Sequence, residues 1–332
     1  MKKIELTSSE FGTLWMTYQE KTMVQRILEY LVESADDPEA KKILHRAHKK
    51  VVGIVGEVSR LFENEGAINP IGYTEEDVNA RAPKLYDHMF DILLLRLLSE
   101  IGMGLHTLHL NMSYRKDLIE LYKSLTEFTQ NTYEECMAYL EKNEAIARPP
   151  AVSPPRIVEF AKGTKYMSGL SPFTEKRSLN TVEVAHLYFA IESNIFGKQL
   201  MTGFAQVANE PECKQYFEEG KELAQRIVQT MSDVLIKSDI QVPATWAGTA
   251  TDSKISPFSD KLMMYCTSLF CSFGLGTNAI GTAFSLRTDL PVKLLGITKD
   301  VFNYGQKGGR IMANNGWLEE PPQMEDRKDL IK

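Results

Sequence analysis

The sequence predicts an all-α protein built as two tandem four-helix bundles. The main observation is an internal duplication, because residues 6–70 align with residues 179–243 without a gap, at a constant offset of 173. After one insertion the offset becomes 174, which pairs Gly102 with Gly276. In the last part of the repeat the offset is 172, which pairs Arg115 with Arg287. Apolar residues recur at helical spacing, and no strand pattern is convincing. A duplicated unit of this size is a whole domain rather than a solenoid repeat.

The duplication divides the chain of 332 residues into two domains. We expect the first copy to span 1–146 and the second 179–325, with a proline-containing linker at 147–178 and a tail at 326–332. Each copy is long enough to bury its own core. The repeat also allows every candidate site residue to be compared with its counterpart in the other copy.

Four long helices are expected in each copy. The first begins after Thr7 or Asn180, where a Glu three residues later completes a capping box. Pro38 and Pro211 suit the first turn of the second helix. The apolar positions of that helix alternate steps of four and three, as in a packed bundle. They are Ala40, Leu44, Ala47, Val51, Ile54, Val58 and Leu61.

A long connection separates the second helix from the third in both copies, at 66–83 and 239–257. Antiparallel neighbours need far shorter loops, so this length predicts a crossover along the bundle. The third helix follows, and the fourth begins near Asp117 or Asp289. In the first copy the seam of the third helix is predicted as Phe90, Leu94, Leu97, Ile101, Gly104 and Leu108. Four helices with one long middle connection describe a ferritin-like bundle.

Composition and charge are those of an ordinary globular protein, with 43% hydrophobic and 25% charged residues. A net charge of −6, spread along the chain, argues against a nucleic-acid partner. The one basic run, within residues 41–50, aligns with a segment that contains Glu218, Glu219 and Glu222, so we interpret it as a solvated helix face.

The segment Leu262–Leu286 carries no charge and is long enough to cross a bilayer. Ten of its 25 residues are Ser, Thr, Gly or Asn, and the aligned helix carries Arg96 and Glu100. We therefore expect a helix packed between other helices and no membrane span. The four cysteines have no metal-ligand spacing and indicate reduced thiols in a cytoplasmic protein.

Several motifs give the chain a family resemblance over nearly its whole length. They are residues 6–10 (LTSSE), 71–78 (IGYTEEDV), 257–264 (PFSDKLMM) and 315–322 (NGWLEEPP). With these motifs the chain resembles the tandem ferritin-like family of unknown function from spore-forming Firmicutes, related to the spore coat protein F-like group. The resemblance implies the bundle fold, a cytosolic or spore-associated location and no established activity.

A ferritin-like metal site needs a Glu on each of two helices and a Glu-x-x-His on each of the other two. The sequence holds one such motif, Glu183-Val184-Ala185-His186, at the very start of a helix. Glu183 already serves there as a capping residue, and we expect His186 to be a buried core histidine. This pair is a weak candidate for a metal site.

The other histidines all belong to the first copy and have no histidine counterparts. His45 and His48, and likewise His106 and His109, are spaced to share a helix face. We place His88, His106 and His109 away from the core seam of their helix, where they could bind metal only adventitiously.

Two carboxylates complete the weak metal candidates. Glu20 lies on an apolar stripe of the first helix, and Glu100 flanks the seam of the third. Their counterparts are Ser193 and Gly274, so a site built from them would exist in one copy only.

The sequence therefore favours a non-enzymatic structural or interaction protein, cytoplasmic or spore-associated, that has a protein partner or self-associates. No catalytic residue and no cofactor is favoured. One alternative is a ferritin-like metalloprotein that binds iron, manganese or zinc in one bundle. Another is a carrier of a small apolar ligand.

Overall fold

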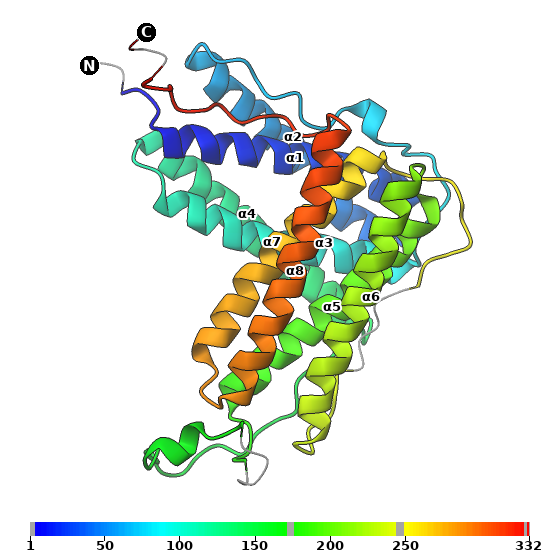
Figure 1. The fold of residues 1–332 in the computed structure, drawn as a ribbon. Helices are drawn as coiled ribbons and strands as arrows, with labels where there is room; N and C mark the ends of the chain where they lie inside the picture. The colour runs from blue at the N-terminus through cyan, green and yellow to red at the C-terminus, as the bar shows by residue number, and fades with distance from the viewer. Residues whose placement is uncertain (1–3, 171–175, 244–248, 329–330, 332) are drawn as a thin grey trace. The chain divides into compact units, whose positions relative to one another are not determined.

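A computed structural model of the chain describes residues 4–170, 176–243, 249–328 and 331, apart from the side chain of His88. These residues form long α-helices and no β-strand, in agreement with the predicted class (Figure 1). The first copy holds α1 (Ser8–Ser34), α2 (Pro38–Asn64), α3 (His88–Asn111) and α4 (Lys116–Lys142). The second holds α5 (Thr181–Val207), α6 (Pro211–Ile236), α7 (Asp260–Phe284) and α8 (Asp289–Asn314). Short 3-10 turns occur at Glu75–Asp77 and Thr164–Met167.

The helix starts follow the predicted capping chemistry. The Thr7 side chain accepts a hydrogen bond from the backbone N–H of Glu10, and the Glu10 carboxylate accepts one from the N–H of Thr7. Asn180 and Glu183 form the same capping box before α5. Such a box satisfies two backbone donors that the first turn of a helix leaves free. Local signals therefore set these boundaries.

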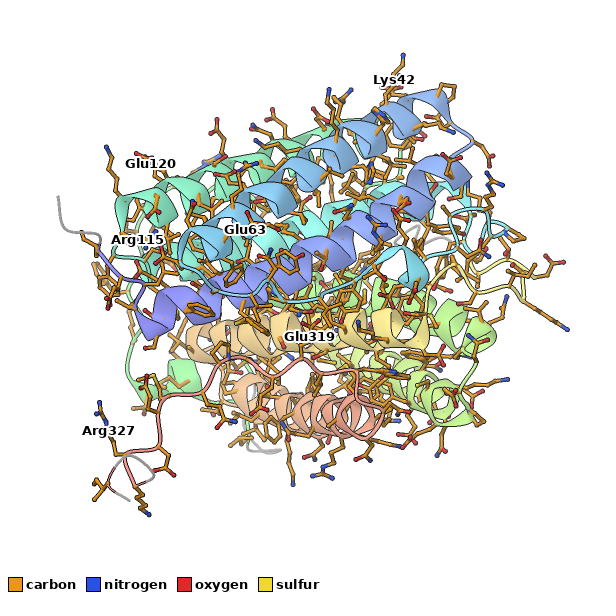
Figure 2. All side chains as sticks on the ribbon, turned by 90° about the horizontal axis from the view of Figure 1, so that it is seen from above. Lys42, Glu63, Arg115, Glu120, Glu319 and Arg327 are labelled. Atoms are coloured by element: carbon orange, nitrogen blue, oxygen red, sulfur yellow. The ribbon has the colours of Figure 1, made fainter. Side chains whose placement is uncertain are left out.

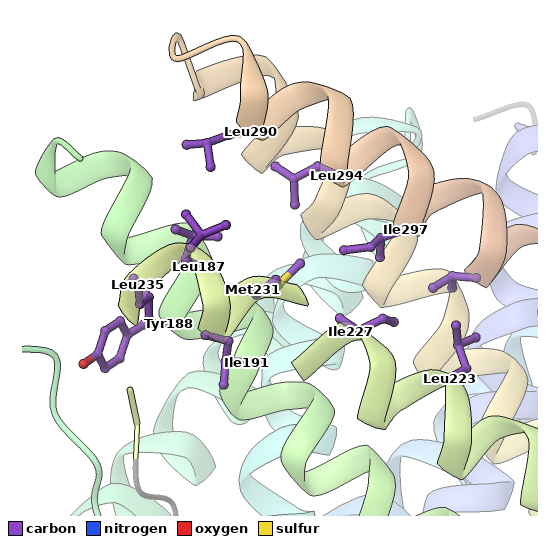
Figure 3. Close-up of a cluster of buried hydrophobic side chains, with 12 residues drawn as sticks. Leu187, Tyr188, Ile191, Leu223, Ile227, Met231, Leu235, Leu290, Leu294 and Ile297 are labelled. Carbon is purple, nitrogen blue, oxygen red and sulfur yellow. The ribbon is translucent and has the colours of Figure 1, made fainter. Parts of the chain in front are cut away.

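Each bundle has its own apolar core. In the first, Leu14 of α1 packs with residues of α2 and α4, including Phe62 and Tyr122, and Leu110 of α3 lies against them. In the second, the core joins α5, α6 and α8, with Cys271 and Leu275 of α7 packed on it. Figure 3 shows Leu187, Ile227 and Leu294 of this second core. The duplicated sequence thus forms two tandem helical bundles.

By contacts, the chain divides into two compact units. Unit 1 comprises Met1–Leu140, Ile255–Met263 and Met312–Lys332, and unit 2 comprises Glu141–Lys254 and Met264–Ile311. Unit 1 therefore includes two segments that belong, by sequence, to the second copy. The long connections predicted between second and third helices are present, although residues 244–248 of the later one lie outside the described residues.

A polar clasp recurs at one end of each bundle. The Glu10 carboxylate accepts hydrogen bonds from the backbone N–H groups of Tyr114 (2.8 Å) and Arg115 (2.7 Å), just before α4. The Glu183 carboxylate accepts one from the N–H of Arg287 (3.1 Å), just before α8. A single buried glutamate therefore caps one helix and fixes the start of another.

The arginine of each clasp also holds an aspartate two residues later. Arg115 contacts both carboxylate oxygens of Asp117, and Arg287 contacts both of Asp289. The identity of these residues in both copies is thus explained by the architecture.

An ion pair between helices recurs with its charges exchanged. Arg46 of α2 lies 2.8 Å from Glu135 of α4 in the first bundle. The aligned positions of the second bundle, 46 + 173 and 135 + 172, are Glu219 of α6 and Lys307 of α8, which lie 2.7 Å apart. The contact is kept while its polarity is reversed.

The basic run and the uncharged segment also have clear positions. Lys41, Lys42, Lys49 and Lys50 are exposed on α2, as expected of a solvated face. No helix among the described residues is long and apolar enough to cross a membrane, and this holds for α7, which carries most of the uncharged segment.

Candidate functional site

The interior of the first bundle contains a buried ion pair. Glu20 and Lys21 of α1 are only 4% and 2% exposed. The Lys21 ammonium lies 3.0 Å from each carboxylate oxygen of Glu20. Buried charges are tolerated when they are paired in this way, because neither ion then lacks a partner in a region of low dielectric.

Two histidines of α3 lie beside this ion pair. His106 Nε2 is 3.8 Å from a carboxylate oxygen of Glu20, and neither ring nitrogen of His106 meets a partner at hydrogen-bond distance and angle among the described residues. His109 Nδ1 lies 3.3 Å from the hydroxyl of Thr17, which is also 3.2 Å from the Tyr122 hydroxyl. Helices α1, α3 and α4 thus contribute to one polar core, defined here as Thr17, Glu20, Lys21, His106, His109 and Tyr122.

A glycine makes room for the polar core. A Cβ atom on Gly102 would lie 2.8 Å from Cγ2 of Thr129 and 3.1 Å from Cε1 of His106. Both distances are shorter than ordinary van der Waals contact. Glycine at this position therefore lets α3 approach α4 and leaves room for the His106 ring beside Gly102.

Burial and the neighbouring charges set the protonation states. Burial raises the pKa of Glu20, but the Lys21 ammonium and His106 more than compensate and lower it to about 2. Burial lowers the pKa of His106, and the nearby Lys21 ammonium lowers it further. Burial and His106 together lower the pKa of His109 to about 4. At neutral pH the polar core therefore holds one carboxylate, one ammonium and two neutral imidazoles.

The position predicted for these histidines was wrong. The sequence placed His106 and His109 away from the core seam, but they are 1% and 3% exposed. Beyond Ile101 the buried face of α3 passes through Gly102, and the predicted seam positions Gly104 and Leu108 are exposed. The spacing of Gly102, His106 and His109 at steps of four and three is the signal that could have indicated this face.

The other candidates are engaged in separate contacts. Glu100 pairs with Arg96, whose Nε donates to it over 2.9 Å. Glu183 accepts two hydrogen bonds from Arg177 in addition to those of its clasp. His186 is half-buried rather than fully buried, and its ring stacks on Phe284 with 6.3 Å between centroids.

His45 and His48 of α2 are not part of the polar core. His45 is exposed and His48 half-buried on α2, while the side chain of His88 lies outside the described set. In the part of the chain that the structure describes, no three His, Cys, Asp or Glu side chains are grouped so that they could hold a metal ion. His106 Nε2 lies 3.8 Å from Glu20, whose carboxylate is already neutralised by Lys21.

The sequence of the second bundle does not repeat the charged residues of the polar core at the aligned positions. Glu20 and Lys21 align with Ser193 and Asn194, which bond to carbonyl groups of their own helix. His106 aligns with Ile280, and His109 with Ala283. The charged interior is therefore specific to the first copy.

Comparisons with known proteins agree with the tandem organisation. Residues 1–158 and 167–330 each match a sequence family described as "Protein of unknown function (DUF3231)". No curated protein matches the sequence. A solved structure described as a "putative spore coat protein" from Bacillus halodurans C-125 is 18% identical, with a TM-score of 0.42. The match covers 45% of this chain and 98% of that one.

Proposed function

Because the chain belongs to the family of proteins of unknown function DUF3231, for which no activity is assigned, we propose a role for it from its geometry. It is a non-enzymatic structural or interaction protein in which a lysine has replaced metal chemistry inside the first bundle. The motif resemblance to the spore coat protein F-like group supports a spore-associated location.

The observation that carries this proposal is the position of the Lys21 ammonium. It lies 3.0 Å from both oxygens of Glu20, a carboxylate of the kind that a ferritin-like protein would use as a metal ligand. A divalent cation at Glu20 would lie close to this ammonium and be repelled by it. The Lys21 ammonium supplies permanently the positive charge that a metal ion would bring to Glu20. The ion pair therefore has a structural role.

Metal analysis tests the proposal directly. Untagged protein, purified without chelators and then dialysed against Fe²⁺, Mn²⁺ or Zn²⁺, is expected to hold well under one metal ion per chain. A Lys21→Met variant removes the competing ammonium, and its affinity for the same ions should rise. Stoichiometric metal in the unaltered protein, lost in Glu20→Gln, would contradict the structural role.

One observation favours a second candidate, a metalloprotein that uses the first bundle. Within the part of the chain that the structure describes, neither ring nitrogen of the buried His106 has a well-formed hydrogen bond, and Nε2 lies 3.8 Å from a carboxylate oxygen of Glu20. An imidazole in this state is a potential ligand. A His106→Asn variant separates the two candidates, because a metalloprotein would lose bound metal with this substitution, whereas a structural protein had none to lose.

Location is tested separately. An antibody raised against the purified protein should detect the chain in the spore fraction of the source organism at a higher level than in vegetative cells. Equal amounts in both fractions would limit the proposal to a structural role without spore association.

A further inference from the structure

The connection between α2 and α3 contains a loop, residues 71–79, that is held firmly on α1. Gly72 has a φ of +65°, and a Cβ atom there would lie 2.4 Å from the hydroxyl oxygen of Thr22. The backbone N–H of Tyr73 donates to the same hydroxyl over 3.2 Å. Glycine is therefore required at this position, both for backbone conformation and for space.

The loop presents two consecutive N–H groups that bind a carboxylate. The N–H groups of Ile71 and Gly72 donate to the two oxygens of Glu319, over 2.7 and 2.6 Å. Successive backbone N–H groups in such a turn form a small anion-binding concavity. Glu319 lies on the extended segment that follows α8 (Figure 2), within unit 1.

A second segment of the later repeat, residues 255–263, binds the rest of the loop. The Lys261 ammonium donates to the carbonyl oxygen of Gly72 over 2.9 Å and lies 4.9 Å from the centre of the Tyr73 ring. Ser259 donates to Asp77 twice, from its hydroxyl to the carboxylate (2.6 Å) and from its backbone N–H to the carbonyl oxygen (2.9 Å).

Apolar and backbone contacts complete the attachment of this segment. The Phe258 ring packs edge-on against Tyr30 of α1, with 5.2 Å between centroids, and Phe258 forms an isolated antiparallel bridge with Val78. The N–H of Asn79 donates to the carbonyl oxygen of Pro257 over 2.8 Å. The loop is thus bound through charge, hydrogen bonds and an aromatic contact.

The side chains with which residues 255–263 and Glu319 bind the loop have no equivalents in the first repeat. By the alignment, the first repeat has Ala147 where Glu319 stands, Asp87 for Lys261 and Leu85 for Ser259. Alanine and leucine side chains cannot replace these hydrogen bonds, and an aspartate cannot donate to the Gly72 carbonyl. The second repeat therefore carries the side chains that bind this loop, and the first repeat could not take its place.

We propose that loop 71–79 is a docking surface whose partner is the second repeat, through residues 255–263 and Glu319. The two repeats form one non-covalent pair that does not depend on the covalent linker. Gly72, Lys261 and Glu319, which make these contacts, lie in the family motifs at 71–78, 257–264 and 315–322. The inference is independent of whether the polar core binds metal.

Cutting the linker of the full-length protein tests this inference. A specific protease site is inserted after Val158, within the exposed segment 151–160, and the folded protein is then cleaved. The two fragments are expected to elute together at micromolar concentration. With the first fragment immobilised, the half-life for loss of the second measures the strength of docking.

Variants assign the association to the docking surface. Glu319→Ala combined with Lys261→Met should shorten the half-life at least about tenfold, because charged hydrogen bonds are lost. Ser259→Ala alone should shorten it a few-fold, which provides a milder test if the double variant folds poorly by circular dichroism. Glu320→Ala is the matched control, since this neighbouring carboxylate is exposed and bonds to Gln323, and it should leave the half-life unchanged.

Two results would overturn the proposal. In one, the cleaved unaltered protein separates into free fragments at micromolar concentration. In the other, Ser259→Ala and the folded double variant keep the half-life of the unaltered protein.

Discussion

Aligned positions of the two bundles carry different chemistry: those of the polar core are buried in the first bundle, whereas Ile280 and Ala283 are exposed in the second. The first bundle buries the Glu20–Lys21 ion pair beside His106 and His109, whereas the second has Ser193, Asn194, Ile280 and Ala283 at the aligned positions. Both nevertheless form four corresponding helices, and the first helix of each begins with the same type of capping box. The fold therefore does not need the polar core, and its presence in one copy is a property added to a shared scaffold.

The polar contacts that both bundles share differ from the polar core, because they connect helices to one another. The Glu10 and Glu183 clasps and the Arg46–Glu135 and Lys307–Glu219 ion pairs all fix one helix against another. The polar residues that recur in both copies thus maintain architecture. Residues that do not recur are where function specific to one copy should be sought.

Breaking the buried ion pair should have the largest effect. Lys21→Met leaves the Glu20 carboxylate buried without its cation, which is expected to reduce the free energy of unfolding by about 3–5 kcal/mol. Denaturant unfolding monitored by circular dichroism measures the change. The double variant Glu20→Ser and Lys21→Asn, which carries the residues of the second bundle, should recover most of the loss. A loss below about 1 kcal/mol in Lys21→Met would show that the pair does not balance buried charge.

Acid should affect the two bundles unequally. Unfolded histidine takes up a proton near pH 6.5, whereas His109 in the fold does so only near pH 4. Between these values the unfolded chain binds more protons, so stability falls as the pH is lowered from about 6.5 to about 4. The expected contribution is roughly 3 kcal/mol.

Unfolding curves of the unaltered protein and of His109→Ala, which carries the residue of the second bundle, should therefore converge as the pH falls through this window. Glu20 acts at lower pH, because its pKa is lowered to about 2 in the fold and its stabilisation is lost only as the pH falls towards that value. Parallel curves for the two proteins between pH 6.5 and 4 would contradict the assignment to His109.

A pair of glycine substitutions should change stability in opposite directions. Gly102→Ala puts a Cβ atom 2.8 Å from Thr129 and should destabilise by about 1–3 kcal/mol. At the aligned Gly276, a Cβ atom would meet nothing within 4 Å, so Gly276→Ala should stabilise its helix by about 0.5–1 kcal/mol. Thermal unfolding of both variants checks the contrast, and equal shifts would contradict it.

The exchanged ion pair should have the smallest effect. Glu135→Gln removes the partner of Arg46 and is expected to cost less than about 1 kcal/mol, because both side chains are largely exposed. Exchanging both residues, Arg46→Glu with Glu135→Lys, reproduces the polarity of the second bundle and should be neutral. High salt should reduce the difference between the single variant and the unaltered protein, and a salt-independent cost above about 1 kcal/mol would contradict an exposed pair.

Sequence patterns predicted what depends on local chemistry. The helix starts at Thr7 and Asn180, the prolines that open α2 and α6, and the long middle connection are all present. The buried face near the end of α3 was not predicted. Continuing the apolar spacing from Phe90 leads to Gly104 and Leu108, whereas the residues buried beyond Ile101 include Gly102, His106 and His109.

The docking of Glu319 on Gly72 was also beyond sequence reasoning. The two residues are 247 positions apart, and neither belongs to a periodic pattern that would bring them together. Gly72 alone carried a local signal, as a glycine in a turn, but a turn does not identify what binds to it. Contacts of this kind depend on the tertiary fold.

The reversed polarity of the ion pair has a consequence for how a tandem repeat folds. A chain that contains two similar bundles can place a helix of one repeat among the helices of the other while it folds. If α2 took the place of α6 beside α8, Arg46 would face Lys307, and if α6 took the place of α2 beside α4, Glu219 would face Glu135. Each wrong combination brings like charges together, whereas each correct one pairs opposite charges. The pair adds little to the stability of either bundle, but its reversed polarity disfavours each wrong combination.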